Sequence, residues 1–94
     1  MEAMITESSG NVFVDLGFDA AEAAILQMRA ELLSDLREYI KSHKMTKRQA
    51  ARKLRIAEPR VSDLIHGKWE KFSLESLITL ESRVGRKVSL RLAA

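Results

Sequence analysis

The sequence predicts a mainly α-helical fold in a single domain, a bundle of about four to five helices with a short extended segment before it and a β-strand after it. Apolar residues recur three or four positions apart through most of the chain, and they alternate with polar residues only at the carboxyl end. The composition agrees, because 46% apolar and 31% charged residues are typical of a soluble globular chain, and 94 residues suffice for one modest core. Residues 1–10 are interpreted as a flexible tail and residues 11–94 as the domain.

The first elements of the domain are an extended segment and the longest helix. Residues 11–17 are apolar and β-branched enough for a short extended segment or strand. Asp19 and Glu22 have the spacing of a capping box, which predicts that a long helix begins there. Its apolar stripe is expected to consist of Ile25, Met28, Leu32, Leu36, Tyr39 and Ile40.

Residues 46–68 predict two short helices that meet at a fixed angle. Thr46 and Gln49 form a capping box at the start of the first helix. Pro59 marks the start of the second, because proline is tolerated in the first turn of a helix, and Gly67 offers it a left-handed stop. The linker, about three or four residues long, has the length that a helix-turn-helix motif requires. Such a motif can place its second helix in the major groove, so double-stranded DNA is the expected partner.

The carboxyl-terminal part predicts one more helix and then a strand. Ser73 can cap the helix, and Gly85 ends it. Residues 86–92 alternate apolar and polar positions, which predicts a β-strand with one buried face. A strand without partners invites pairing, either with residues 12–16 of its own chain or with its copy in a second molecule. We favour the second arrangement, because a two-fold dimer places two reading helices one turn of DNA apart.

Charge is distributed unevenly along the chain. Residues 1–36 hold seven acidic residues against Arg29, whereas residues 37–94 hold fifteen basic residues against six acidic ones. The two parts therefore carry −6 and +9 within a net charge of +3. The basic part contains the helix-turn-helix motif, where neutralisation of DNA phosphates needs it.

Several classes of function are disfavoured by what the sequence lacks. It has no cysteine, no histidine pair at metal-ligand spacing, no glycine-rich phosphate loop and no evident pair of catalytic acids. We therefore expect no enzyme activity, no catalytic residue, no cofactor and no metal. No apolar run approaches the roughly twenty residues of a membrane span, and the amino terminus lacks an export pattern. The absence of cysteine fits a reducing compartment, so we expect a cytoplasmic location without membrane attachment.

The candidate DNA contacts lie at the start of the first motif helix and along the second. They are Thr46, Lys47, Arg48, Glu58, Arg60, Ser62, Asp63, His66 and Lys68. The first three offer a hydroxyl, exposed amides and two cations to a phosphate oxygen. Arg60 can donate two hydrogen bonds to guanine or clamp a phosphate, and Lys68 suits a phosphate. His66 suits the helix dipole better than it suits DNA.

Glu58 and Asp63 are unexpected on such a face, because carboxylates repel phosphates. They can accept a hydrogen bond from a cytosine amine, or they can orient Arg60 by pairing with it. The motif can also be a helical hairpin without a DNA role. The two carboxylates keep open a protein-interaction module on the same fold.

A small set of residues in the motif carries a family resemblance. Ala51 sits where the two helices approach most closely, Ile56 lies in the turn, and a Pro-Arg-Val-Ser run begins at Pro59. In these residues the chain resembles the XRE-type, or Cro/repressor-like, helix-turn-helix regulators. It departs from their pattern at Arg55, where glycine is usual, and at Ala57, where serine is usual and alanine cannot cap. The resemblance implies a sequence-specific transcriptional repressor that binds an operator.

The order of the predicted elements extends the resemblance over residues 11–92. An Asn-Val-Phe-x-Asp-Leu-Gly segment, a long helix, the motif, a Phe-Ser-Leu-Glu helix and a final strand follow one another as in regulators similar to HigA antitoxins. This resemblance implies the antitoxin of a type II toxin–antitoxin pair, a homodimer that autoregulates its operon and neutralises a RelE/HigB-like ribonuclease toxin. The acidic amino-terminal third agrees with a basic toxin as partner, although its acids can equally serve to solubilise a helix. The alternative is a stand-alone XRE-type repressor without a toxin partner.

Overall fold

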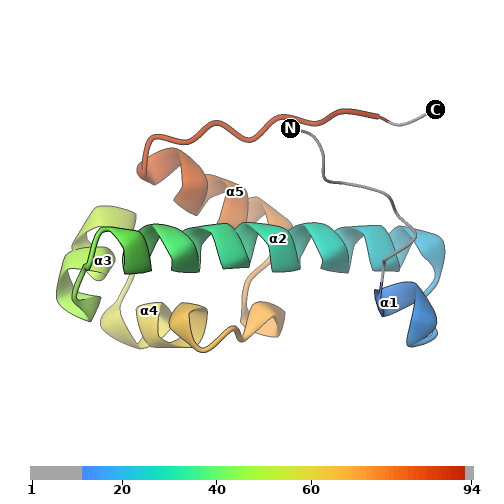
Figure 1. The fold of residues 1–94 in the computed structure, drawn as a ribbon, viewed down its shortest axis with the longest axis horizontal. Helices are drawn as coiled ribbons and strands as arrows, with labels where there is room; N and C mark the ends of the chain where they lie inside the picture. The colour runs from blue at the N-terminus through green and yellow to red at the C-terminus, as the bar shows by residue number, and fades with distance from the viewer. Residues whose placement is uncertain (1–11, 93–94) are drawn as a thin grey trace.

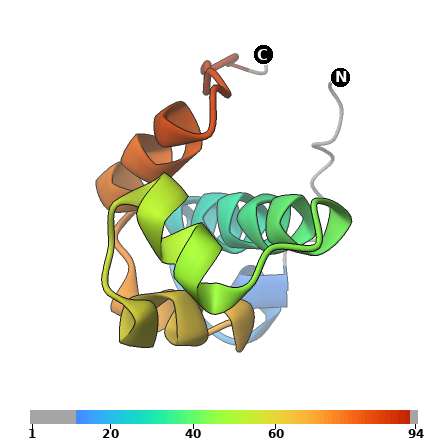
Figure 2. The ribbon, with the colours of Figure 1, turned by 90° about the vertical axis from the view of Figure 1, so that its left-hand side faces the viewer.

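The computed structural model of the chain describes residues 12–92, which form five α-helices and one 3-10 helix (Figure 1). The elements are α1 (Val12–Asp15), α2 (Ala20–Ser42), α3 (Lys47–Leu54), α4 (Glu58–Ile65), η2 (Trp69–Lys71) and α5 (Leu74–Arg83). Helix α2 forms the long axis of the molecule, α4 and α5 flank it, and α3 crosses near its carboxyl end (Figures 1 and 2). The prediction of a mainly α-helical bundle is confirmed.

Helix α2 begins where its capping residue predicts, but it buries a different face. The side chain of Asp19 accepts a hydrogen bond from the backbone N–H of Glu22 at 2.8 Å. The buried residues of the helix are Ala23, Leu26, Leu33, Leu36 and Ile40. Two members of the predicted stripe are therefore wrong, since Ile25 is 45% exposed and Met28 is 38% exposed. The helix carries apolar residues on more than one face, and periodicity alone does not choose between them.

The main hydrophobic core lies where α2, α3, α4 and α5 meet. Its most completely buried large side chains are Leu36, Leu54, Leu64, Phe72 and Leu77. Full burial of one such side chain stabilises the folded state by about 1.5–3 kcal/mol. Each of these four helices contributes at least one of them, so α3 and α4 are held as a unit against α2 and α5.

A second, smaller core joins α1 to the η2 segment. Phe13, Ala23 and Leu26 are buried in it, and the ring of Phe13 meets the ring of Trp69 edge-on at a centroid distance of 5.8 Å. The extended segment predicted at residues 11–17 is therefore wrong over its described part, because Val12–Asp15 form α1. A helical turn buries Phe13 against Trp69, and this packing outweighs the β-propensity of the segment.

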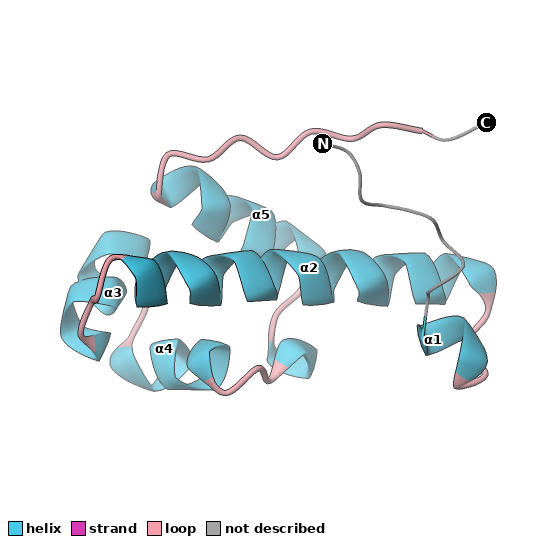
Figure 3. Cartoon of the chain, in the orientation of Figure 1, coloured by secondary structure: helices cyan, strands magenta, loops and turns pink. Residues whose placement is uncertain are grey.

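The β-strand predicted at residues 86–92 is also wrong. These residues follow α5 as an extended and exposed segment, and no strand occurs between residues 12 and 92 (Figure 3). A strand requires a neighbouring strand with which its backbone forms hydrogen bonds. Residues 12–16 were the expected neighbour within the chain, but they form α1 and the turn after it. We call residues 86–92 the C-terminal arm.

Helix α5 begins and ends as predicted. The side chain of Ser73 accepts a hydrogen bond from the backbone N–H of Ser76 at 3.1 Å, and Gly85 follows the helix with a φ of 82°. The predicted flexible tail at residues 1–10 lies outside the described residues. Among the helices of residues 12–92, none combines the length and apolarity that crossing a bilayer requires.

A buried carboxyl group lies at the contact between α5 and α2. Glu81 is 1% exposed, and within the described chain its two carboxyl oxygens have no hydrogen-bond partner. Burial, and then the neighbouring Asp35 of α2, raises the pKa of Glu81 to about 8, while the charge of Arg86 acts in the opposite direction. Arg86 forms an ion pair with Asp35 and lies over the ring of Tyr39. The C-terminal arm therefore leaves the domain from an anchored point beside α2.

Candidate nucleic-acid interface

Helices α3 and α4 form the predicted helix-turn-helix unit, which faces the viewer in Figure 2. Residues 55–57 connect them. The capping box is present, because the side chain of Thr46 accepts a hydrogen bond from the N–H of Gln49 at 3.1 Å, and Gln49 Oε1 accepts one from the N–H of Thr46 at 2.9 Å. These two bonds define where α3 begins.

The turn between the two helices contains a residue in a disfavoured conformation. Arg55 has a φ of 62°, in the left-handed region where glycine carries no steric penalty. The backbone N–H of Ile56 then donates to the carbonyl oxygen of Ala51 at 3.0 Å, and the Ile56 side chain packs against the main core. Arg55 therefore holds a strained left-handed turn, with a cost of about 1–2 kcal/mol.

Helix α4 begins without a side-chain cap. Ala57 occupies the capping position and makes no side-chain hydrogen bond, while Pro59 lies in the first turn. The carboxylate of Glu58 lies at the same end, where the positive pole of the helix favours it. The departure at Ala57 therefore leaves the helix start intact.

Four of the predicted contact residues lie together between α3 and α4. Lys47 Nζ donates a hydrogen bond to Ser62 Oγ at 3.2 Å, and Arg48 Nε lies 3.9 Å from Glu58 Oε2. The side chains of Arg48 and Glu58 are 80% and 54% exposed, so their ion pair contributes at most about 1 kcal/mol. Such a pair opens readily when a phosphate offers Arg48 a better partner.

Three further predicted residues lie at the carboxyl end of α4. Lys68 Nζ is 3.9 Å from Asp63 Oδ1, and His66 Nδ1 is 2.7 Å from the backbone oxygen of Ser62. The position of His66 agrees with its predicted role at the helix end. In the described chain, the ion-pair partner of Asp63 is Lys68 and not Arg60, so the prediction that the recognition-face acids orient Arg60 is not supported by these contacts.

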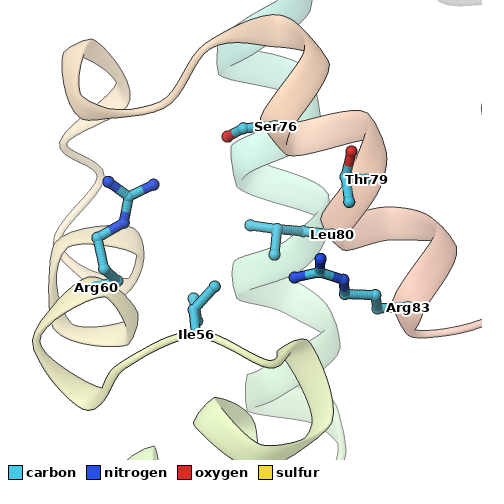
Figure 4. A pocket seen from close by; sticks show the side chains of 6 residues that line it. All are labelled: Ile56, Arg60, Ser76, Thr79, Leu80 and Arg83. Carbon is cyan, nitrogen blue, oxygen red and sulfur yellow. The ribbon is translucent and has the colours of Figure 1, made fainter.

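Arg60 is turned away from the other candidates. Its guanidinium carbon lies 4.5 Å from the centroid of the Phe72 ring, on the side of α4 that faces α5. It lines an open hollow of about 170 Å³. Figure 4 shows Leu80 and Arg83 of α5 across from it. Arg60 is nevertheless exposed, and an exposed cation–π contact is worth about 0.5–1 kcal/mol, so the side chain can leave the ring at small cost.

Two arginines that the sequence reasoning missed enlarge the basic surface. Arg52 is exposed and follows Arg48 by one helical turn, and Arg55 is exposed at the turn. The four-residue spacing from Arg48 was the signal that identifies Arg52. Arg83 has a structural role, because its Nη1 donates to the carbonyl oxygen of Leu54 at 2.8 Å and so ties α5 to the end of α3.

The α3–α4 face offers binding chemistry. Its groups are exposed ammonium and guanidinium donors, a partly buried serine hydroxyl and two carboxylates engaged in weak ion pairs. Such donors suit phosphate oxygens and the edges of bases. No group of three or more histidine, cysteine, aspartate or glutamate side chains in residues 12–92 is arranged to hold a metal ion.

A protein-family model described as a helix-turn-helix domain matches residues 12–93, which is most of the chain. No curated protein matches the chain.

Proposed function

We propose that this chain, which belongs to the helix-turn-helix domain family, is a sequence-specific DNA-binding transcriptional repressor. The observation that carries the proposal is the joint between the helices, where Lys47 Nζ at the start of α3 is 3.2 Å from Ser62 Oγ on α4. A phosphate bound at this joint positions α4, and α4 then reads the major groove. The basic character of residues 37–94 supplies the sequence-independent part of the affinity.

The roles of the individual residues follow from their surroundings. Lys47 and Arg48 bind phosphate together with the first amides of α3, and Lys68 binds phosphate at the far end of α4. Ser62 and Asp63 present hydrogen-bonding groups to base edges. Glu58 also contacts base edges. On DNA binding its carboxylate leaves the ion pair with Arg48 and accepts a hydrogen bond from a base amine.

Arg60 reads guanine after it leaves the Phe72 ring. The guanidinium fork suits the two acceptors of a guanine edge, and such a pair is worth about 1–3 kcal/mol of discrimination. The contact with Phe72 costs less than this to break. In the free protein the Arg60 side chain therefore packs on the Phe72 ring, and on DNA binding it leaves the ring and contacts guanine.

The repressor acts as a homodimer through its C-terminal arm. A two-fold dimer presents two copies of α4 to two half-sites, which doubles the specific contact area that a single small module offers. The arm supplies unpaired backbone groups and the exposed side chains of Leu90 and Leu92, which are 73% and 85% exposed in the single chain. Burial of these leucines in a dimer contact removes their apolar surface from water.

Fluorescence anisotropy tests the DNA roles with two duplexes, the DNA upstream of the protein's own gene and a scrambled duplex of equal length. Lys47→Ala is expected to weaken binding to both duplexes by a similar factor. It is also expected to make the affinity less dependent on salt concentration, by about the amount that one phosphate contact per protomer contributes. Arg60→Ala is expected to weaken the specific complex by about 1–3 kcal/mol and to leave the scrambled duplex nearly unchanged. Arg60→Lys is the matched variant, because it keeps the charge and removes the planar fork.

Two results contradict these assignments. If Arg60→Ala weakens binding to both duplexes equally, then Arg60 contacts phosphate or only packs on the Phe72 ring. If the wild-type protein shows no salt-sensitive preference for its own upstream DNA, the repressor proposal fails, and the protein-interaction module becomes the better description.

Within the repressor class, we infer an XRE-type antitoxin of the HigA type. The support is the order of a short amino-terminal segment, a long helix, the motif and a Phe-Ser-Leu-Glu helix, together with the acidic character of residues 1–36. In the described part of that region, Asp15 and Asp19 lie close in sequence to the exposed apolar side chains of Val14 and Leu16. A basic RelE/HigB-like ribonuclease toxin is the partner that this combination of acidic and apolar groups fits.

Co-purification from the native operon tests the toxin partner. We expect a basic ribonuclease encoded beside the protein to co-elute with it and to lose activity in the complex. Asp15→Lys is expected to release the ribonuclease while DNA binding persists. If the operon encodes no such ribonuclease, the antitoxin proposal fails. The protein is then a stand-alone repressor whose function is DNA binding.

A further inference from the structure

Six exposed apolar side chains gather in two sets that lie near each other in the fold. One set is on the helices, where Ile25 and Met28 of α2 and Ile78 of α5 are 38–45% exposed. The other set is on the C-terminal arm, at Val88, Leu90 and Leu92. Neither set belongs to the two hydrophobic cores.

The helical set lies along the contact between α2 and α5. Helices α2 and α5 meet where Asp35 of α2 neighbours Glu81 of α5. Met28 precedes Asp35 by two helical turns, and Ile78 precedes Glu81 by one turn. Each therefore lies on the side of its helix that faces the other helix. Farther along, Ile25 and Leu74 line an open groove between α2 and the start of α5. We call Ile25, Met28, Leu74 and Ile78 the α2–α5 face.

The arm starts beside this face and has the length to cover it. Arg86 pairs with Asp35, and the arm then runs back along α2 toward the amino end of that helix (Figure 1). Its residues after Arg86 extend about 20 Å, whereas Asp35 and Ile25 are about 15 Å apart along α2. In an extended segment, the side chains of alternate residues share a side, so the apolar residues of the arm share the side of Arg86.

The arm of the same chain leaves this face uncovered. Leu90 and Leu92 remain 73% and 85% exposed although the arm is anchored at Arg86. The two surfaces also complement each other in charge. Helix α2 carries Glu31 and Glu38 on the side of Asp35, and the arm carries Lys87 and Arg91 in addition to Arg86, which already pairs with Asp35 of its own chain. A second copy of this chain supplies an occupant with the matching apolar pattern and charge.

We propose that the α2–α5 face is the docking surface for the C-terminal arm of a second copy of the chain. This inference rests on the proposed homodimer and names the surface that each protomer offers. The apolar side of each arm packs on the α2–α5 face of the other protomer. The exchange is reciprocal, so one set of contacts occurs twice and the dimer closes.

Cross-linking tests the docking directly, because the chain contains no cysteine. Met28→Cys and Leu90→Cys proteins, one of them carrying a mass tag, are mixed and oxidised mildly. We expect the mixed disulfide dimer to be enriched over the product of Leu16→Cys with Leu90→Cys, since Leu16 is 69% exposed and lies outside the face. The proposal is overturned if the two mixtures cross-link equally, or if the Met28→Cys, Leu90→Cys double variant closes its disulfide within a single chain.

Sedimentation measures the contribution of the arm to the dimer. Leu90→Asp is expected to raise the dimer dissociation constant by about 100-fold, because the substitution enters the interface twice. Leu16→Asp is the matched control and is expected to leave it unchanged. A dimer that tolerates Leu90→Asp overturns the proposed docking.

DNA binding is measured separately on the same variants. A dimer that forms by this interface and ignores the upstream DNA refutes the repressor proposal while it supports the docking. A DNA-binding protein whose dimer is indifferent to Leu90→Asp refutes the docking and leaves the repressor proposal standing.

Discussion

The buried carboxyl of Glu81 makes the stability of the domain depend on pH. Glu81→Gln replaces the carboxyl by an amide of the same shape that does not titrate. In the folded protein the pKa of Glu81 is about 8, against 4.5 as the ordinary value. At pH values between these two, the folded state holds a proton that the unfolded state has released. Rising pH therefore favours unfolding across this window.

The magnitude follows from the size of the shift. Each unit of pKa difference corresponds to about 1.4 kcal/mol, so the free energy of unfolding of the wild-type protein falls by up to about 5 kcal/mol across the window. The contribution is fully present below pH 4.5 and is lost as the pH rises through about 8. Glu81→Gln removes this slope, and the variant is expected to be the more stable protein under alkaline conditions.

Urea denaturation followed by far-ultraviolet circular dichroism measures the effect. The two proteins are unfolded at one protein concentration over a series of pH values, and the difference in their free energies of unfolding is plotted against pH. Glu38→Gln, at an exposed position of α2, serves as the control and is expected to leave the slope unchanged. The reasoning is refuted if the wild-type protein and Glu81→Gln show the same dependence on pH.

Three further substitutions test local features of the fold. Arg55→Gly is expected to raise the melting temperature, because glycine adopts the left-handed turn without strain. The gain in the free energy of unfolding is limited to about 1 kcal/mol, since glycine also gives the unfolded chain more conformational freedom. A lower melting temperature contradicts the strain. Arg29→Lys is expected to cost about 1–3 kcal/mol in urea denaturation, since Arg29 donates to the carbonyl oxygens of Phe72 and Trp69 and lysine lacks the fork to reach both. Thr46→Ala is expected to cost about 1 kcal/mol and Thr46→Ser much less, and equal losses would show that the hydroxyl cap is unimportant.

The helix-turn-helix unit could be predicted because its signals are local. Thr46 with Gln49, Pro59 and Gly67 act on their own backbone neighbours, and Leu54 and Leu64 bury the only apolar side that the short helices have. The position where the resemblance expects glycine, residue 55, is the left-handed residue of the turn. Elements of this kind depend little on the rest of the chain.

The errors concern elements whose structure depends on distant residues. Whether residues 12–15 form a helix or a strand is decided by the packing of Phe13 on Trp69, far along the sequence. In α2 both Leu26 and Met28 fit a helical stripe, and the arrangement of its neighbours decides which one is buried. The C-terminal arm has the alternation of a strand, but alternation supplies no partner.

The candidate site shows the same division. The positions of Lys47 and Ser62 follow from the motif, whereas the direction of Arg60 depends on Phe72, which belongs to a later segment. Glu81 has the sequence context of a surface residue on an amphipathic helix. Only the approach of α2 encloses it, so no local pattern identifies it as buried.

The single tryptophan of the chain lies between the two hydrophobic cores. Trp69 packs against the main cluster and against the smaller cluster at α1, and the guanidinium of Arg29 lies 5.5 Å from the centroid of its ring. Loosening of either cluster therefore alters the surroundings of the same indole. Its intrinsic fluorescence serves as an unlabelled optical reporter, which registers events at the α1 end and in the segment after α4 through one chromophore.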